Sequence, residues 1–168
     1  MGMKPALLVI DMQKAFYGDP RVKASMDSAA ENINPVLSWF RKKALPVYWI
    51  HHTEEGGPLE GQPDFEFIDA LVKKEGEPRI IKRYQNSFAK TGLGEMLSAQ
   101  GVDTVFVTGF CAEYCVLSTC RGARDLDLTS ILVRGCAASD NAEHIRFVEE
   151  INDVISVNLV KSYLNLAG

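Results

Sequence analysis

Ala6-Leu7-Leu8-Val9-Ile10 is the stretch that decides the fold, because it is an uninterrupted apolar run that ends at Asp11. A run this short and continuous is typical of a parallel strand that helices cover on both faces. It falls far short of the roughly 18 apolar residues of a membrane helix, and it is too short for the core of a signal peptide. The run therefore predicts a buried strand in a cytoplasmic α/β protein that has no membrane partner.

Strand and helix patterns alternate outward from this run. Further strands are predicted at residues 46–50, 79–82, 102–108, 130–133 and 154–160. Helices are predicted at about 28–43, 65–72, 93–99, 114–126 and 141–151, with a loop at 53–63. This alternation predicts stacked βαβ units, a mostly parallel sheet and helices on both of its faces. Because no repeat or linker interrupts the pattern, we expect one domain over residues 1–168.

The composition narrows the classes of function before any motif is considered. Of the 168 residues, 46% are hydrophobic and 24% are charged, which excludes a wholly disordered chain. There are 18 Lys and Arg against 22 Asp and Glu, so the net charge of −4 argues against a nucleic-acid partner. No two of the cysteines form a CxxC pair, so we expect free thiols rather than a zinc site or a disulfide scaffold. These cysteines are Cys111, Cys115, Cys120 and Cys136.

Three chemically active side chains are expected at the carboxyl ends of strands, where open α/β sheets bind their ligands. They are Asp11, Lys82 and Cys115. Cys115 begins a predicted helix, and the positive end of a helix favours a nucleophilic thiolate. Asp11 could take up the thiol proton, and a buried Lys82 would stabilise both anions. Structural alternatives stay open at this point: a small buried cysteine, a capping aspartate and a solvated lysine.

Two adjacent histidines, His51 and His52, follow the second predicted strand and suggest a metal site. Neighbouring residues of a strand point to opposite faces, so the two side chains would not bind the same ion. We therefore expect no metal, and the sequence leaves open which of the two histidines meets a ligand. His144 lies inside a predicted helix and is interpreted as structural.

Three segments of the chain carry a family resemblance. Asp11 lies in VIDMQKAF (9–16), Lys82 in IIKRYQNSF (80–88) and Cys115 in VTGFCAEYCV (107–116). In this order they resemble the isochorismatase-like cysteine hydrolase superfamily, which includes nicotinamidases and N-carbamoylsarcosine amidohydrolase. The likeness extends from about residue 5 to residue 150, which is nearly the whole chain.

The resemblance implies a fold and a mechanism. The fold is a three-layer α/β/α sandwich around a mainly parallel six-stranded sheet. The catalytic triad is Asp11, Lys82 and Cys115, and the Cys115 thiolate attacks a carbonyl carbon to form a thioester that water hydrolyses. The backbone N–H groups of Cys111 and Cys115 form the oxyanion hole, with a cis peptide bond between Phe110 and Cys111. No cofactor is implied, and a homo-oligomer, a dimer or a tetramer, is expected.

Departures from the family pattern bear on the substrate. Nicotinamidases of the superfamily carry an Asp-x-His metal motif where this chain has Trp49-Ile50-His51, which disfavours a metal-dependent nicotinamidase. True isochorismatases cleave a vinyl ether and lack the cysteine that stands here at Cys115. Side chains near the strand ends are interpreted as a substrate pocket, with a core position as the alternative for the aromatic ones. These residues are Phe16, Trp49, His51, Tyr84 and Tyr114.

The expected function is hydrolysis of a C–N bond in a small amide, carbamoyl or ureido compound. The alternatives are an isochorismatase-type ether or ester hydrolase and a catalytically idle binding domain on the same fold. The loop at 53–63 is interpreted as a lid or an interface segment, and its Glu54, Glu55 and Glu60 would oppose anionic substrates. The role of Glu113, close to Cys115, is left open.

Overall fold

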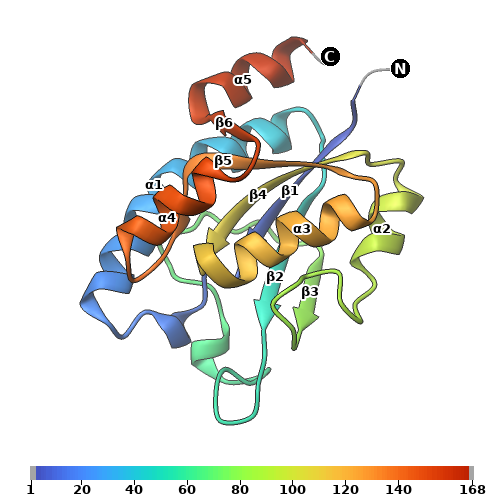
Figure 1. The fold of residues 1–168 in the computed structure, drawn as a ribbon. Coiled ribbons are helices and arrows are strands. Elements are labelled where there is room, and N and C mark those ends of the chain that lie inside the picture. Colours follow the sequence, from blue (N-terminus) through green and yellow to red (C-terminus); the bar gives the residue numbers. More distant parts are fainter. Residues whose placement is uncertain (1–2, 167–168) are drawn as a thin grey trace.

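Six parallel strands form one sheet in the computed structural model, which describes residues 3–166. Their order is β3-β2-β1-β4-β5-β6, so β1 and β4 are the innermost strands (Figure 1). The six-stranded parallel sheet expected from the sequence is therefore confirmed. The expected domain spans residues 1–168, of which residues 1, 2, 167 and 168 lie outside the described part. The strands are β1 (Pro5–Ile10), β2 (Val47–His52), β3 (Arg79–Lys82), β4 (Thr104–Phe110), β5 (Thr129–Ala138) and β6 (Val154–Ser156).

Helices cover both faces of this sheet and confirm the three-layer arrangement. On one face lie α1 (Pro20–Lys42) and α5 (Val157–Leu166), and on the other lie α2 (Leu93–Ala99), α3 (Leu117–Asp125) and α4 (Ala142–Glu150) (Figure 1). Every residue of β1 is buried. Leu7 and Val9 belong to the core shared with α1, whereas Leu8 and Ile10 belong to the core shared with α2 and α3. The opening apolar run is thus apolar throughout because both of its faces are covered.

Helix α1 begins at Pro20 rather than near residue 28. Asp19 caps the helix, because its carboxylate accepts a hydrogen bond from the backbone N–H of Arg21 at 2.8 Å. Proline suits the first helical position, where its missing N–H is not needed. Val22 and Met26 are buried and extend the apolar face of the helix toward its start.

The predicted helix at 65–72 is wrong. A short 3₁₀ turn, Pro63–Phe65, is followed by an irregular loop. Phe67 pairs with Gln13 in an isolated antiparallel bridge, and the backbone N–H of Ile68 donates to Met12 O at 2.9 Å. Phe67 and Ile68 are each 1% exposed. Their apolar side chains therefore anchor a loop to the core, although their spacing imitates a helix.

The predicted strand at 154–160 is a strand only at its start. β6 ends at Ser156, and α5 begins at Val157. Val160 and Leu164, one helical turn apart, are buried in the core that α1 covers. β-branched residues favour a strand locally, but burial against α1 selects the helix.

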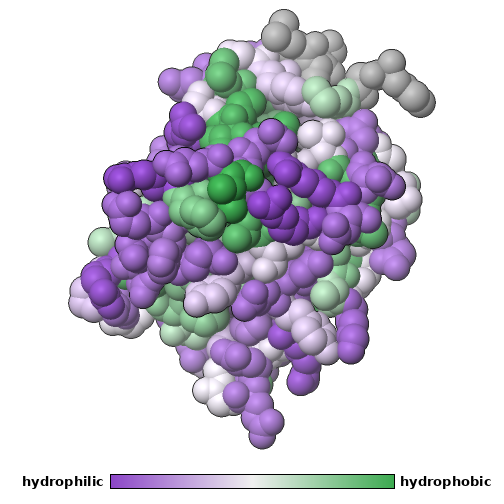
Figure 2. Space-filling model, viewed as in Figure 1, coloured by the Kyte–Doolittle hydropathy of each residue, from purple (hydrophilic) through white to green (hydrophobic). Residues whose placement is uncertain are grey.

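The molecular surface gives few further signals about partners. It is mainly hydrophilic in the view of Figure 2, with hydrophobic residues gathered over β6 and α5 at the upper end. Leu159 of α5 is 58% exposed. No helix within residues 3–166 is both long enough and apolar enough to cross a membrane. The cytoplasmic location and the homo-oligomer stay predictions.

Candidate active site

Three side chains from different strand ends meet at one buried point. Asp11 follows β1, Lys82 is the last residue of β3, and Cys115 lies in the turn after β4. The Lys82 ammonium lies 2.8 Å from Asp11 Oδ2 and 3.3 Å from Cys115 Sγ, and all three residues are buried. The fold therefore brings together the acid, the cation and the thiol that were expected at strand ends.

The backbone at the ends of β1 and β4 allows this close approach. Asp11 has a φ of 51°, in the left-handed region that Asp tolerates better than most residues. Gly109 has a φ of 121°, and a Cβ atom there would lie 2.1 Å from the backbone oxygen of Ile10. Only glycine fits between the two strands at this position. Gly109 therefore sets how closely the turn that carries Cys115 approaches Asp11.

Lys82 uses every hydrogen-bond donor that it has. An ammonium group carries three N–H donors. They reach Asp11 Oδ2, Cys115 Sγ and, at 3.3 Å, His52 Nδ1. The side chain of Lys82 is 0% exposed. Its charge is therefore balanced by groups of the site rather than by water.

Cys115 lies in a π-helical turn, Ala112–Val116, and α3 begins only after it, at Leu117. The predicted helix at 114–126 is therefore two elements rather than one. The backbone N–H groups of Tyr114 and Val116 both donate to Cys111 O at 3.1 Å. The peptide bond between Phe110 and Cys111 is cis, at the place that the family resemblance implies.

The surroundings of Cys115 favour the protonated thiol over the thiolate. Burial first, and the Asp11 carboxylate second, raise the pKa of the Cys115 thiol to about 12, against the opposing effect of Lys82. Burial likewise raises the pKa of Asp11, although Lys82 opposes it. Burial and the Asp11 carboxylate therefore oppose the thiolate that a helix end would favour, and Cys115 lies before α3 rather than in its first turn. At neutral pH the sulfur needs a base before it can attack.

The second carboxylate oxygen of Asp11 is available as that base. Asp11 Oδ1 is buried and has no hydrogen-bond partner among residues 3–166. Ligand atoms of Asp11, His52 and Cys115 lie within 4.8 Å of one another, as in a metal site. Lys82 Nζ contacts all three side chains, so an ammonium group stands where a metal ion would.

A cleft of about 340 Å³ opens onto these residues. Phe16 and Tyr114, both predicted to form a substrate pocket, line it. Its other lining residues are Asp11, His52, Glu54, Arg83, Gln85, Phe110, Cys111 and Cys115. A larger hollow, of about 820 Å³ beside α2, is lined by none of them. The cleft's volume is at the lower end of the range for small-molecule sites.

Trp49 and His51 do not line the cleft, and their place is in the core. They occupy alternate positions of β2 and face the side of the sheet that α1 covers. Trp49 Nε1 donates to Glu77 Oε2 at 2.8 Å. His51 packs against Phe65 and Phe67, with ring centroids 4.9 Å and 4.2 Å away. Burial lowers the pKa of His51 to about 4, so its ring is neutral at neutral pH.

Tyr84 also lies outside the cleft. Its side chain is 47% exposed in a neighbouring hollow, where its hydroxyl accepts a hydrogen bond from Lys90 Nζ at 3.0 Å. Tyr84 follows Lys82 by two residues, but β3 has already ended there. Sequence distance from the strand end therefore does not set the direction of this side chain.

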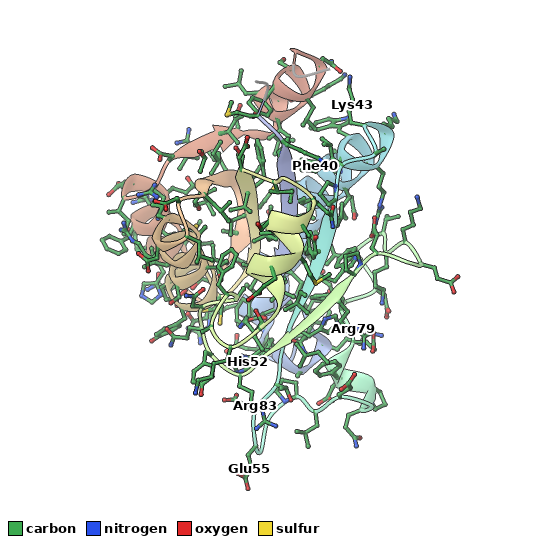
Figure 3. The ribbon with its side chains drawn as sticks, turned by 90° about the vertical axis from the view of Figure 1, so that its right-hand side faces the viewer. Phe40, Lys43, His52, Glu55, Arg79 and Arg83 are labelled. Atoms are coloured by element: carbon green, nitrogen blue, oxygen red, sulfur yellow. The ribbon has the colours of Figure 1, made fainter. Side chains whose placement is uncertain are left out.

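His52 and Arg83 are cleft residues that the sequence reasoning did not assign. They lie near each other at the carboxyl end of the strands, at the lower end of the molecule in Figure 3 and opposite to Phe40 and Lys43. The period of two along a strand is the signal that could have placed His52 beside Lys82, once His51 is assigned to the core. Arg83 directly follows Lys82. Within residues 3–166 it has no hydrogen bond or ion pair.

Glu113 does not line the cleft but anchors the turn that carries Cys115. Its carboxylate accepts hydrogen bonds from Cys111 Sγ at 3.1 Å and Ser139 Oγ at 3.1 Å. His144 Nδ1 lies 2.7 Å from the same carboxylate. Glu113 thus ties the turn to the end of β5 and to α4. The role that the sequence left open for Glu113 is therefore structural.

Comparison with known proteins places these features in a family. A family model described as the isochorismatase domain matches residues 5–157. A secreted isochorismatase effector of Verticillium dahliae is 34% identical over 119 residues, which are 68% of this chain and 62% of that protein. The chain thus spans less than two thirds of that relative's length.

Two further matches cover more of the chain. Maleamate amidohydrolase of Pseudomonas putida is 29% identical over 161 residues, 84% of this chain and 76% of that protein. The crystal structure of an isochorismatase-like hydrolase from Alkaliphilus metalliredigens matches with a TM-score of 0.86 and 25% identity. That match covers 98% of this chain and 99% of the other.

Proposed function

This chain belongs to the isochorismatase family, and from that premise we propose that it is a cysteine-dependent hydrolase of a small amide, carbamoyl or ureido compound. The observation that carries the proposal is the buried Lys82 ammonium, 2.8 Å from Asp11 Oδ2 and 3.3 Å from Cys115 Sγ. Together these side chains supply a base, a balancing charge and a nucleophile. The proposed reaction therefore needs no cofactor.

The first half of the reaction transfers the acyl group of the substrate to Cys115. Asp11 takes the thiol proton through Oδ1 while the sulfur attacks the carbonyl carbon. The backbone N–H groups of Cys111 and Cys115 stabilise the oxyanion that forms. The C–N bond then breaks as Asp11 passes the proton to the leaving nitrogen. The products are a thioester on Cys115 and free ammonia or an amine.

The second half regenerates the enzyme. Asp11, again a carboxylate, takes a proton from water as the water oxygen attacks the thioester carbon. The C–S bond breaks, the acid product leaves, and the sulfur recovers the proton from Asp11. The Lys82 ammonium balances the negative charge on whichever group carries it.

The cleft suggests the kind of amide. Phe16 and Phe110 form an apolar wall, with ring centroids 5.4 Å apart. Arg83 lines the cleft and offers a guanidinium that suits a carboxylate of the substrate, although Glu54, which lines the same cleft, opposes an anion there. Similarity to a maleamate amidohydrolase supports an amide substrate. We therefore expect a small amide, with those that carry a carboxylate as the first to test.

The test measures ammonia release from pairs of small amides, in which one member carries a carboxylate and the other does not. The wild-type protein and Cys115→Ala are compared on the same pairs. The wild type should release ammonia, and intact-mass spectrometry should detect an acyl adduct on Cys115. Cys115→Ala should lose both while keeping its fold. Full turnover of a verified substrate by Cys115→Ala would reject the cysteine mechanism and favour ether or ester hydrolysis.

A further inference from the structure

We propose that His52 is a positioning residue that accepts the third N–H of Lys82 and thereby directs the ammonium at Asp11 and Cys115. This inference rests on the proposed function, because it assigns a task within that catalytic cluster. It adds a fourth side chain to the three that the family resemblance implies.

The first support is the hydrogen bonding of Lys82. Two of its donors are taken by Asp11 and Cys115, and the third is 3.3 Å from His52 Nδ1. The Lys82 side chain is 0% exposed, so water cannot replace a missing acceptor without a rearrangement. A buried ammonium hydrogen without an acceptor is costly, and the side chain would turn to satisfy it. His52 therefore limits where the ammonium can point.

The second support is the way in which His52 itself is held. Gln13 Oε1 accepts the backbone N–H of His52 at 2.7 Å, and Gln13 Nε2 donates to the backbone oxygen of His52 at 3.0 Å. Gln13 is 0% exposed and also donates to Phe65 O at 2.9 Å. Both backbone groups of His52 are thus bound by one buried side chain. The backbone that carries the His52 ring is thereby held in place beside Lys82.

The contact requires one particular tautomer of His52. Lys82 only donates, so Nδ1 of His52 must be the unprotonated nitrogen and Nε2 must carry the hydrogen. His52 Nε2 lies 3.6 Å from Glu54 Oε2. The other charged or titratable groups that line the same cleft or contact the ring are Asp11, Lys82, Arg83, Cys111, Tyr114 and Cys115. A second proton on His52 would replace the acceptor by a donor and place two cations side by side.

The experiment compares His52→Asn with His52→Leu. The asparagine side chain can present an oxygen where Nδ1 stands, whereas leucine fills the space without an acceptor. We expect kcat to fall about 10- to 100-fold in His52→Leu, with KM nearly unchanged, and to be largely restored in His52→Asn. Equal loss in both variants, or wild-type turnover in His52→Leu, would overturn the proposal.

Two readouts need no substrate and separate this proposal from the proposed function. In His52→Leu the alkylation of Cys115 should shift to higher pH, because a displaced Lys82 stabilises the thiolate less. In the wild-type protein, ¹⁵N NMR should find the neutral His52 ring protonated at Nε2. A ring protonated at Nδ1, or an unchanged alkylation profile, would reject the role of His52 even if Cys115 proves to be the nucleophile.

Discussion

At the scale of single residues, the proposed chemistry starts from a thiol that holds its proton. The pKa of Cys115 is raised to about 12, by burial and then by the Asp11 carboxylate. A protonated thiol beside a free carboxylate oxygen is a pair in which deprotonation and attack occur together. The buried ammonium of Lys82 keeps the pair near neutral overall charge.

This electrostatic arrangement predicts opposite effects of Asp11→Asn on two reactions of the same sulfur. The Asp11 carboxylate raises the pKa of the thiol, so replacing it with a neutral amide should let the thiolate form at lower pH. Iodoacetamide should then label Cys115 faster at pH 7 than in the wild type, while hydrolysis is lost because no base remains. Peptide mass spectrometry measures the labelling. Slower labelling of Cys115 in Asp11→Asn would contradict the assigned direction.

At the scale of elements, the site exists because the end of β4 lies against the end of β1. Gly109 makes that contact possible, and the π-helical turn after it presents Cys115. Glu113 then holds the turn through Cys111, Ser139 and His144. The turn that carries Cys115 is thus held by contacts to β1, to the end of β5 and to α4 rather than by the helix that follows it.

Gly109→Ala should therefore destabilise the protein strongly. The added Cβ would lie 2.1 Å from Ile10 O in a backbone with a φ of 121°, so both strain and a clash with the backbone oppose it. We expect a loss of at least about 3 kcal/mol in the free energy of unfolding, measured by urea denaturation. Gly18→Ala is the matched control, because a Cβ there meets nothing within 4 Å. Equal stability of the two variants would contradict this account of the β1–β4 contact.

At the scale of the whole molecule, the core on the α1 side buries an imidazole among aromatic rings. That core includes Phe67, and His51 packs against this ring with both ring nitrogens unpaired among the described residues. Burial disfavours the protonated, charged form of an imidazole, because water cannot solvate the charge there. The loop that replaces the predicted helix at 65–72 supplies the aromatic rings that bury it.

His51 should therefore make the fold sensitive to acid. Its pKa is about 4 in the folded protein and about 6.5 in an unfolded chain, so the unfolded state takes up the proton first. Above about pH 6.5, His51 does not lower the free energy of unfolding. As the pH falls toward 4, protonation of this residue in the unfolded chain lowers the free energy of unfolding by about 3 kcal/mol. Urea denaturation at pH 7 and pH 4.5 should show a smaller loss in His51→Leu than in the wild type. An equal loss in both proteins would contradict the assignment.

Strand and helix alternation, read from apolar patterns alone, predicts much of this fold. β1, β3 and α2 occur where the patterns place them, because local propensity and burial agree there. Two of the elements that differ do so because burial overrides a local pattern. Residues 65–72 anchor a loop, and residues 157–160 form a helix against α1.

The features of the site also fall into those that the sequence predicts and those that depend on the fold. By itself the sequence determined which residues stand at the carboxyl ends of parallel strands, since strand ends follow from hydrophobic pattern and chain order. Only the tertiary structure decided which of two adjacent histidines faces Lys82, where Tyr84 points and whether Cys115 keeps its proton. Those outcomes depend on burial and on atoms far apart in the chain, and no local pattern encodes either of them.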